Sequence, residues 1–98
     1  MFLATVVYDN GNGLATEIFL GKSQIEVEEK AINDIYAYVL GHRPSFYPSI
    51  EQQLKVIDDC FSSDGDDRID VNIFNLETEE RVRPEQFRRT PPQSEPLG

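Results

Sequence analysis

One stretch of the sequence, residues 23–41 (SQIEVEEKAINDIYAYVLG), constrains the fold most because it carries the signals for both ends of a helix. Ser23 is followed three residues later by Glu26, a capping box that satisfies backbone N–H groups of the first turn. Gly41 suits the C-terminal cap, and Pro44 prevents the helix from continuing. The sequence therefore predicts a long helix against which the other elements pack.

The apolar residues of this helix fall on one stripe, because each residue advances by about 100° around the helix axis. The stripe contains Ile25, Ile32, Ile35, Tyr36 and Val39, and the opposite side carries an exposed ladder of Glu26, Lys30 and Asp34. Glu28 is the exception, since it falls inside the apolar stripe. We expect the helix dipole to favour an acid there and the stem to reach outward to solvent. The alternative is a buried functional carboxylate.

Three segments rich in β-branched and aromatic residues predict strands. Residues 2–8 (FLATVVY) and 14–20 (LATEIFL) flank a turn at residues 9–13 (DNGNG), which gives a hairpin. Alternation divides the second strand between two faces, with Leu14, Thr16, Ile18 and Leu20 on one and Ala15, Glu17 and Phe19 on the other. Residues 68–76 (RIDVNIFNL) predict a third strand, which we expect to pair with the first, the most apolar and hence central strand. Its core face carries Ile69, Val71 and Ile73.

A second helix is predicted to begin at Ser49, with an apolar stripe of Ile50, Leu54, Ile57 and Phe61. The predicted order is therefore β-β-α-α-β. It implies an α+β fold, a two-layer sandwich with a three-stranded antiparallel sheet and two helices on one face. We expect residues 1–76 to form this single domain. Residues 77–98, rich in Pro, Arg and Glu, are expected to form a tail that is extended or partly disordered.

The chain is strongly acidic, with 18 Asp and Glu residues against 9 Lys and Arg residues and a formal net charge of −9. Such a charge repels nucleic acids and anionic membranes and attracts basic surfaces. The densest acidic stretch contains Asp58, Asp59, Asp64, Asp66, Asp67 and Asp70. Three interpretations compete: a docking surface for the Arg and Lys side chains of a basic protein, a loose cation site at Asp64, Asp66 and Asp70, and an ordinary solvated turn.

The inventory of catalytic side chains is small, with one histidine, His42, and one cysteine, Cys60. A Cys–His nucleophile needs both in contact with a third, orienting group. Cys60 instead falls beside the apolar stripe of the second helix, where a buried, inert thiol is usual. We therefore expect no enzyme activity, no catalytic residue, no metal and no cofactor.

The lone cysteine also favours a reducing compartment, because it cannot form an internal disulfide. The first residues, MFLATVVYDNG, have no basic segment, and their apolar run stops at Asp9. We therefore expect neither a signal peptide nor a membrane span, and the predicted location is the cytoplasm.

An apolar surface is expected on the sheet face opposite the core, at Phe19, Phe74 and Leu76. Such a face is too apolar to be left to solvent. Either the tail, anchored by Val82 and Phe87, or a second copy of the chain would cover it, so a homodimer is a hypothesis.

The layout of residues 2–76 (a hairpin, a capped helix, a second helix, an Asp/Gly turn and a last strand) resembles, with its charge, small acidic proteins of phages and mobile elements. Some of these are anti-CRISPR or antirestriction proteins. The resemblance implies an inhibitor of a nucleic-acid-binding defence complex, in the host cytoplasm if a phage encodes it. It transfers no individual residue, and Lys30 and Lys55 interrupt the acids of both helices, unlike the long carboxylate rows of strong DNA mimics.

The sequence therefore predicts a non-enzymatic acidic binding protein that occupies a basic, nucleic-acid-binding protein surface and does not bind nucleic acid directly. Its predicted site is the stretch of six carboxylates. The alternative is a structural or assembly module that self-associates, or joins a complex, through the apolar sheet face.

Overall fold

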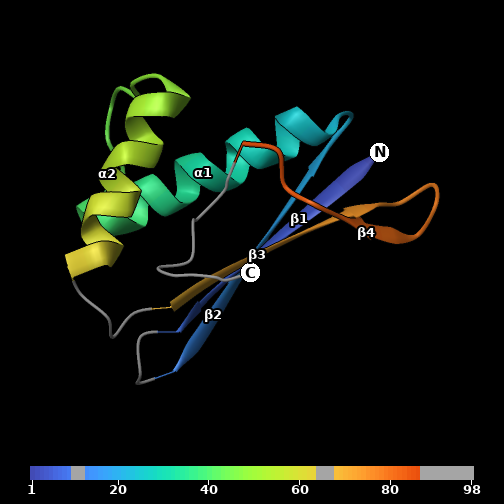
Figure 1. Cartoon of the computed structure of the whole chain (residues 1–98), viewed down its shortest axis with the longest axis horizontal. Coiled ribbons are helices and arrows are strands. Elements are labelled where there is room, and N and C mark those ends of the chain that lie inside the picture. Colours follow the sequence, from blue (N-terminus) through green and yellow to red (C-terminus); the bar gives the residue numbers. More distant parts are fainter. Residues whose placement is uncertain (10–12, 64–67, 87–98) are drawn as a thin grey trace, which may run out of the picture.

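The computed structural model describes residues 1–9, 13–63 and 68–86, which form two helices and one four-stranded antiparallel sheet (Figure 1). The elements are β1 (Phe2–Asp9), β2 (Leu14–Gly21), α1 (Gln24–Leu40), α2 (Ile50–Ser63), β3 (Arg68–Asn75) and β4 (Glu80–Val82). The α+β class, the hairpin and both helices are as predicted.

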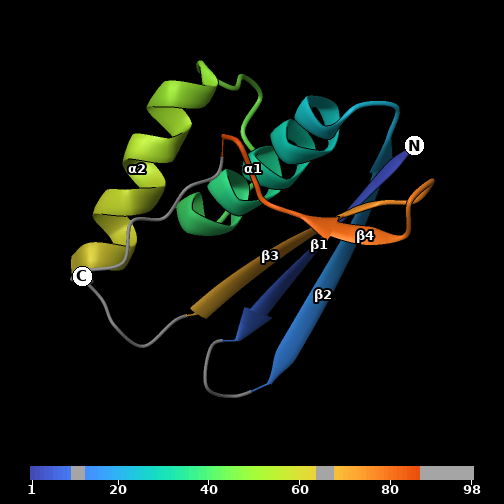
Figure 2. The ribbon, with the colours of Figure 1, turned by 45° about the vertical axis from the view of Figure 1, so that its right-hand side comes forward.

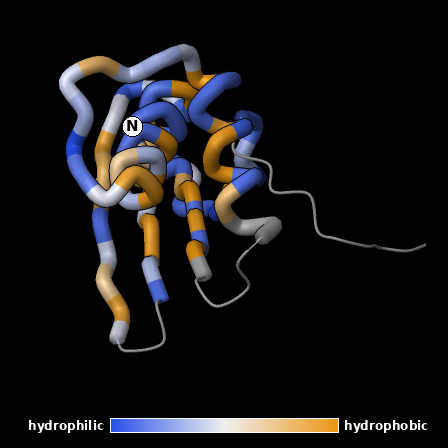
Figure 3. The backbone as a smooth tube through the Cα atoms, turned by 90° about the vertical axis from the view of Figure 1, so that its left-hand side faces the viewer, coloured by the Kyte–Doolittle hydropathy of each residue, from blue (hydrophilic) through white to orange (hydrophobic). Residues whose placement is uncertain are grey.

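The strands lie in the order β2-β1-β3-β4, so β1 lies between β2 and β3. β1 pairs with β2 from Phe2–Gly21 to Asp9–Leu14, and on its other side it pairs with β3 along its whole length. The predicted pairing of the first strand with the last predicted strand is therefore confirmed. Hydrophobic and hydrophilic residues alternate along β3 (Figure 3), as is usual for a strand whose two faces meet different surroundings.

The prediction of three strands is corrected by β4, which adds Glu80–Val82 to the edge of β3. The turn that makes this hairpin is built on Asn75, whose side-chain Oδ1 accepts the backbone N–H of Glu77 at 2.9 Å. The backbone N–H of Glu79 donates to the Asn75 carbonyl at 2.7 Å, and Glu79 has a φ of 60°. Glu is an uncommon residue in that left-handed region, so the sequence carried little signal for the turn.

Both predicted ends of α1 are confirmed. The Ser23 hydroxyl accepts the N–H of Glu26 at 3.2 Å, and the Glu26 carboxylate accepts the N–H of Lys22 at 3.0 Å. That backbone N–H, followed by the nearby Lys30 ammonium, holds the pKa of Glu26 below its ordinary value. Gly41 ends the helix with a φ of 83°, a left-handed conformation that glycine adopts without strain.

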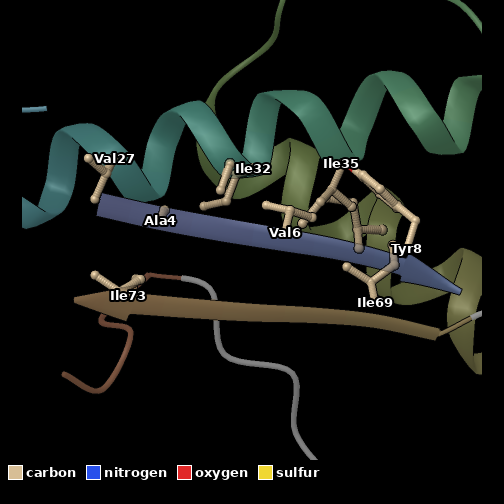
Figure 4. Close-up of a cluster of buried hydrophobic side chains, with 10 residues drawn as sticks. Ala4, Val6, Tyr8, Val27, Ile32, Ile35, Ile69 and Ile73 are labelled. Atoms are coloured by element: carbon tan, nitrogen blue, oxygen red, sulfur yellow. The ribbon is translucent and has the colours of Figure 1, made fainter. Parts of the chain in front are cut away.

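The core lies between α1 and the sheet (Figure 4). Val27, Ile32 and Ile35 of α1 project onto β1 and β3 and are fully buried there. α2 lies on the same side of the sheet, where its neighbour is α1, and Ile57 joins the core (Figure 2). The core is completed by Ala4, Val6, Tyr8, Ala31, Ile69 and Ile73.

Candidate interaction surface

The sheet has one face covered by α1 and one open face, on which no helix or strand of the described residues lies (Figure 2). Residues directly opposite each other in a sheet share a face, so the strand register assigns the members of the open face. Leu3 lies opposite both Leu20 and Phe74. The apolar residues of the open face are Leu3 and Val7 of β1, Leu14, Ile18 and Leu20 of β2, and Phe74 of β3.

The exposed part of this apolar set is concentrated on β2. Leu14, Ile18 and Leu20 are 72%, 62% and 50% exposed, whereas Leu3, Val7 and Phe74 are half-buried. Scattered exposed apolar residues are normal on soluble proteins, but these three share one face of one strand, where only Thr16 separates Leu14 from Ile18. The β2 side of the open face is therefore the most apolar exposed strand surface that the structure describes.

β2 is also an edge strand, and the residues that the structure describes give it little of the usual protection. Its pairing with β1 is uninterrupted, so it has no bulge, and it contains no proline and only one charged residue, Glu17. Residues 14–18 are exposed on both faces, and this end of the strand extends beyond the helices (Figure 1). At the other end, the Lys30 ammonium donates to the Leu20 carbonyl at 2.7 Å. Proteins usually shorten, charge or kink such an edge, because its backbone can pair with another strand.

The open face is close to neutral. By the register its charged residues are two acids and two bases, Asp9, Asp70, Arg68 and Arg81. Arg81 donates to the Asn72 Oδ1 at 3.3 Å. The chain as a whole carries −9, so nearly all of the net charge belongs to other surfaces.

The predicted apolar face is corrected at two of its three residues. Phe74 lies on the open face, but Phe19 lies opposite Ala4 and packs against the core on the helix side. Leu76 lies in the turn after β3 and is exposed. Gly21 explains the orientation of β2: it shares the face of Phe19, and a Cβ there would lie 2.9 Å from Val27 Cγ1. The close approach of α1 therefore fixes the odd-numbered face of β2 toward the core, although that face is the less apolar one.

The six predicted carboxylates do not form one described cluster. Asp58 and Asp59 are exposed on α2, on the helix side of the sheet. Asp70 is exposed on the open face, opposite Val7. Asp64, Asp66 and Asp67 lie outside the described residues. The sheet therefore separates Asp70 from the two acids of α2.

Glu28 is fully buried, which corrects the expectation that its carboxylate reaches solvent. Its Oε2 accepts the backbone N–H of Glu85 at 2.7 Å, and its Oε1 accepts the backbone N–H of Gln86 at 2.6 Å. Gln24 Nε2 donates to the same carboxylate at 2.8 Å and to the Arg83 carbonyl at 2.7 Å. The only sequence signal was the interruption of the apolar stripe, because the partners lie 57 and 58 residues away.

Gln24 and Glu28 therefore bind residues 83–86 to α1 on the helix side of the sheet (Figure 2). Val82, predicted to anchor the tail on the apolar face, instead lies opposite Ile73 and packs against the core. Phe87, the other predicted anchor, lies outside the described residues. The described part of the C-terminal segment thus leads away from the open face.

A second polar arrangement joins β1 to α1. The Tyr8 hydroxyl donates to Asp34 Oδ2 at 2.5 Å, and the Tyr8 ring stacks on Tyr38 with 4.4 Å between centroids. Burial, then the bond to Asp34, raises the pKa of Tyr8 far above its ordinary value. Asp34 is therefore bound to the sheet and does not extend the exposed ion-pair ladder, although Lys30 and Glu26 do pair at 3.4 Å.

The Tyr8 hydroxyl borders a shallow hollow of about 520 Å³. Its lining includes Glu17 and Asp34 as acids and His42 and Arg43 as bases. These opposite charges select no particular class of ligand. Cys60, the other residue considered for catalysis, lies half-buried on α2. Within residues 1–9, 13–63 and 68–86, no three His, Cys, Asp or Glu side chains are grouped so that they could hold a metal ion.

None of the helices in the described ranges is both long and apolar enough to cross a bilayer. A scan against protein-family models and searches of curated proteins and of solved structures found no match.

Proposed function

We propose that the chain is a non-enzymatic assembly module that binds a second copy of itself through the β2 side of its open sheet face. The observation that carries this proposal is the row of exposed apolar side chains on β2, at Leu14, Ile18 and Leu20. Burying apolar surface drives association at about 25 cal/mol per Å² before the costs of ordering are subtracted. The fold of a single copy leaves this row in water.

The charge distribution supports a second copy as the occupant. Two chains that each carry −9 repel one another wherever their acidic surfaces meet. The open face, on which the register places two acidic and two basic residues, is the surface on which this repulsion is smallest. A basic partner would gain most from the acidic surfaces and little from this one.

The chain's own C-terminal segment is the less suitable occupant. Its described part is held on the opposite side of the molecule, since Glu28 binds the backbone of residues 85 and 86 beside α1. Val82, just before it, is packed into the core side of the sheet. A second copy can reach the open face while the C-terminal segment stays beside α1.

The test compares two substitutions that add the same charge at exposed apolar residues. Ile18→Asp places a carboxylate in the apolar row of β2, and Phe46→Asp places one in the loop between the helices. In sedimentation velocity, Ile18→Asp is expected to raise the dimer dissociation constant at least about tenfold. Phe46→Asp should leave it unchanged. Equal effects of the two variants, or a wild-type chain that stays monomeric, would contradict the proposal.

A second candidate function is an acidic inhibitor that occupies a basic, nucleic-acid-binding surface of a larger protein. The observation that favours it is the exposure of Asp58 and Asp59 on α2, away from the open face. Binding of this kind should weaken steeply as salt is added, and Asp58→Asn/Asp59→Asn should weaken it further. Binding that is indifferent to salt would exclude this mechanism.

A further inference from the structure

Among the described strands, β2 has a neighbour on one side only, and its open edge favours a particular arrangement of two copies. We propose that the β2 strands of two copies pair antiparallel with Thr16 opposite Thr16 of the partner, which joins two four-stranded sheets into one. This inference rests on the proposed self-association and adds its geometry. The contact between the two copies is backbone hydrogen bonding between the outer edges of their β2 strands.

The two edges of the sheet differ in their capacity for such pairing. β4 has three residues, and Arg81 lies at its centre, whereas β2 has eight residues and one charge. The segment Leu14–Ile18 is exposed on both faces, so a second strand can approach it from the side. An edge of this length and composition is a template for strand addition.

The register follows from which side chains would meet. Antiparallel pairing around a two-fold axis keeps even-numbered residues opposite even-numbered ones. The apolar rows of the two copies then lie side by side, so opposed side chains shield one another's flanks from water while the joined face stays open. A register centred on Glu17 would place two carboxylates directly opposite each other, which is destabilising. Registers centred on Thr16 or Ile18 avoid this contact.

The hydrogen bond from Lys30 to β2 favours the register centred on Thr16 over the one centred on Ile18. Its ammonium already occupies the Leu20 carbonyl at 2.7 Å, beside the start of α1. Centring on Ile18 would bring Leu20 into the paired segment, opposite Thr16 of the partner. Centring on Thr16 pairs residues 14–18 and leaves Leu20 outside.

The Thr16-centred register also gives the better side-chain pairs. Leu14 and Ile18, the two most exposed residues of the row, then lie opposite each other twice, once on each side of the axis. Thr16 meets Thr16, and Glu17 meets Ala15 of the partner on the helix side. Apolar and Thr–Thr pairs of this kind are favourable across strands.

Cysteine cross-linking tests the register directly. In a Cys60→Ser background, Thr16→Cys, Glu17→Cys and Ile18→Cys are oxidised at a concentration where sedimentation shows dimer. Directly opposed Cα atoms lie within the range that a disulfide spans. Thr16→Cys is expected to form covalent dimer at least about tenfold faster than the other two. A mixture of Leu14→Cys and Ile18→Cys chains should cross-link between unlike copies.

Two results would overturn the inference in distinguishable ways. If the chain dimerises but Ile18→Cys or Glu17→Cys cross-links as fast as Thr16→Cys, the register is wrong and the proposed self-association stands. If the wild-type chain is monomeric at every concentration and no cysteine position cross-links, both proposals fail together.

Discussion

The two faces of the sheet are built from the same strands but meet different surroundings. Ile73 and Phe74 are neighbours in β3, yet Ile73 is fully buried under α1 and Phe74 lies on the open face. The covered face accounts for the fold of a single copy, because α1 and α2 bury apolar side chains only on that side. The apolar residues of the open face are half-buried or exposed and contribute less to that fold, which is the basis for proposing a second copy as their partner.

The largest expected effect is on the free energy of unfolding, which should fall more for a substitution on the covered face than for one on the open face. Ile73→Ala leaves a cavity in the core and should lower the free energy of unfolding by about 3 kcal/mol. Phe74→Ala, one residue further along the same strand, should cost about 1 kcal/mol because the side chain is only half-buried. Urea denaturation at a concentration where the chain is monomeric measures both. Equal losses would mean that the open face is as important to the single-copy fold as the covered one.

The next largest loss of stability is expected at Glu28, whose carboxylate binds the backbone of residues 85 and 86. Glu28→Gln replaces one acceptor oxygen by an amide donor, which cannot accept the second backbone N–H, and should cost about 2 kcal/mol. Glu29→Gln, at the half-exposed neighbour, is the control and should cost far less. Amide hydrogen exchange should become faster at Glu85 and Gln86 in Glu28→Gln alone. Unchanged exchange at those two amides would show that Glu28 does not hold the segment.

The smallest effect is at Tyr8, and it depends on pH. Tyr8→Phe removes the bond to Asp34 and should cost about 1 kcal/mol at neutral pH. Because the fold raises the pKa of Tyr8, the protonated form stabilises the fold fully below the unfolded pKa of about 10, and this stability is lost as pH rises above it. The wild-type advantage over Tyr8→Phe should therefore shrink above that pH. An advantage that stays constant in alkaline urea titrations would contradict this assignment.

The sequence predicted what depends on local chemistry. Ser23 and Gly41 mark the ends of α1 through hydrogen bonds within a few residues, and the alternation in β3 places Ile69 and Ile73 on the core face. It could not choose the face of β2, because alternation defines two faces and leaves the choice to tertiary packing. The more apolar set proved to be the exposed one, since α1 crosses closely over Gly21.

Contacts between residues far apart in the sequence could not be predicted either. Glu28 was recognisable as an exception in its stripe, but its backbone partners at residues 85 and 86 belong to a segment with no strand or helix signal. The candidate surface was predicted only in part, since Phe74 belongs to it and Phe19 does not. Residues Leu14, Ile18 and Leu20 became candidates once the pairing with β1 was known.

The central claim is that the open face exists to bind a second copy, and the salt dependence of self-association tests it most directly. Sedimentation velocity of the wild-type chain over a wide concentration range should show a reversible monomer–dimer equilibrium. The dimer should become stronger as salt is added, because salt screens the repulsion between two chains of −9 while apolar contact persists. A chain that remains monomeric at all concentrations, or a dimer that salt dissociates, would contradict the account.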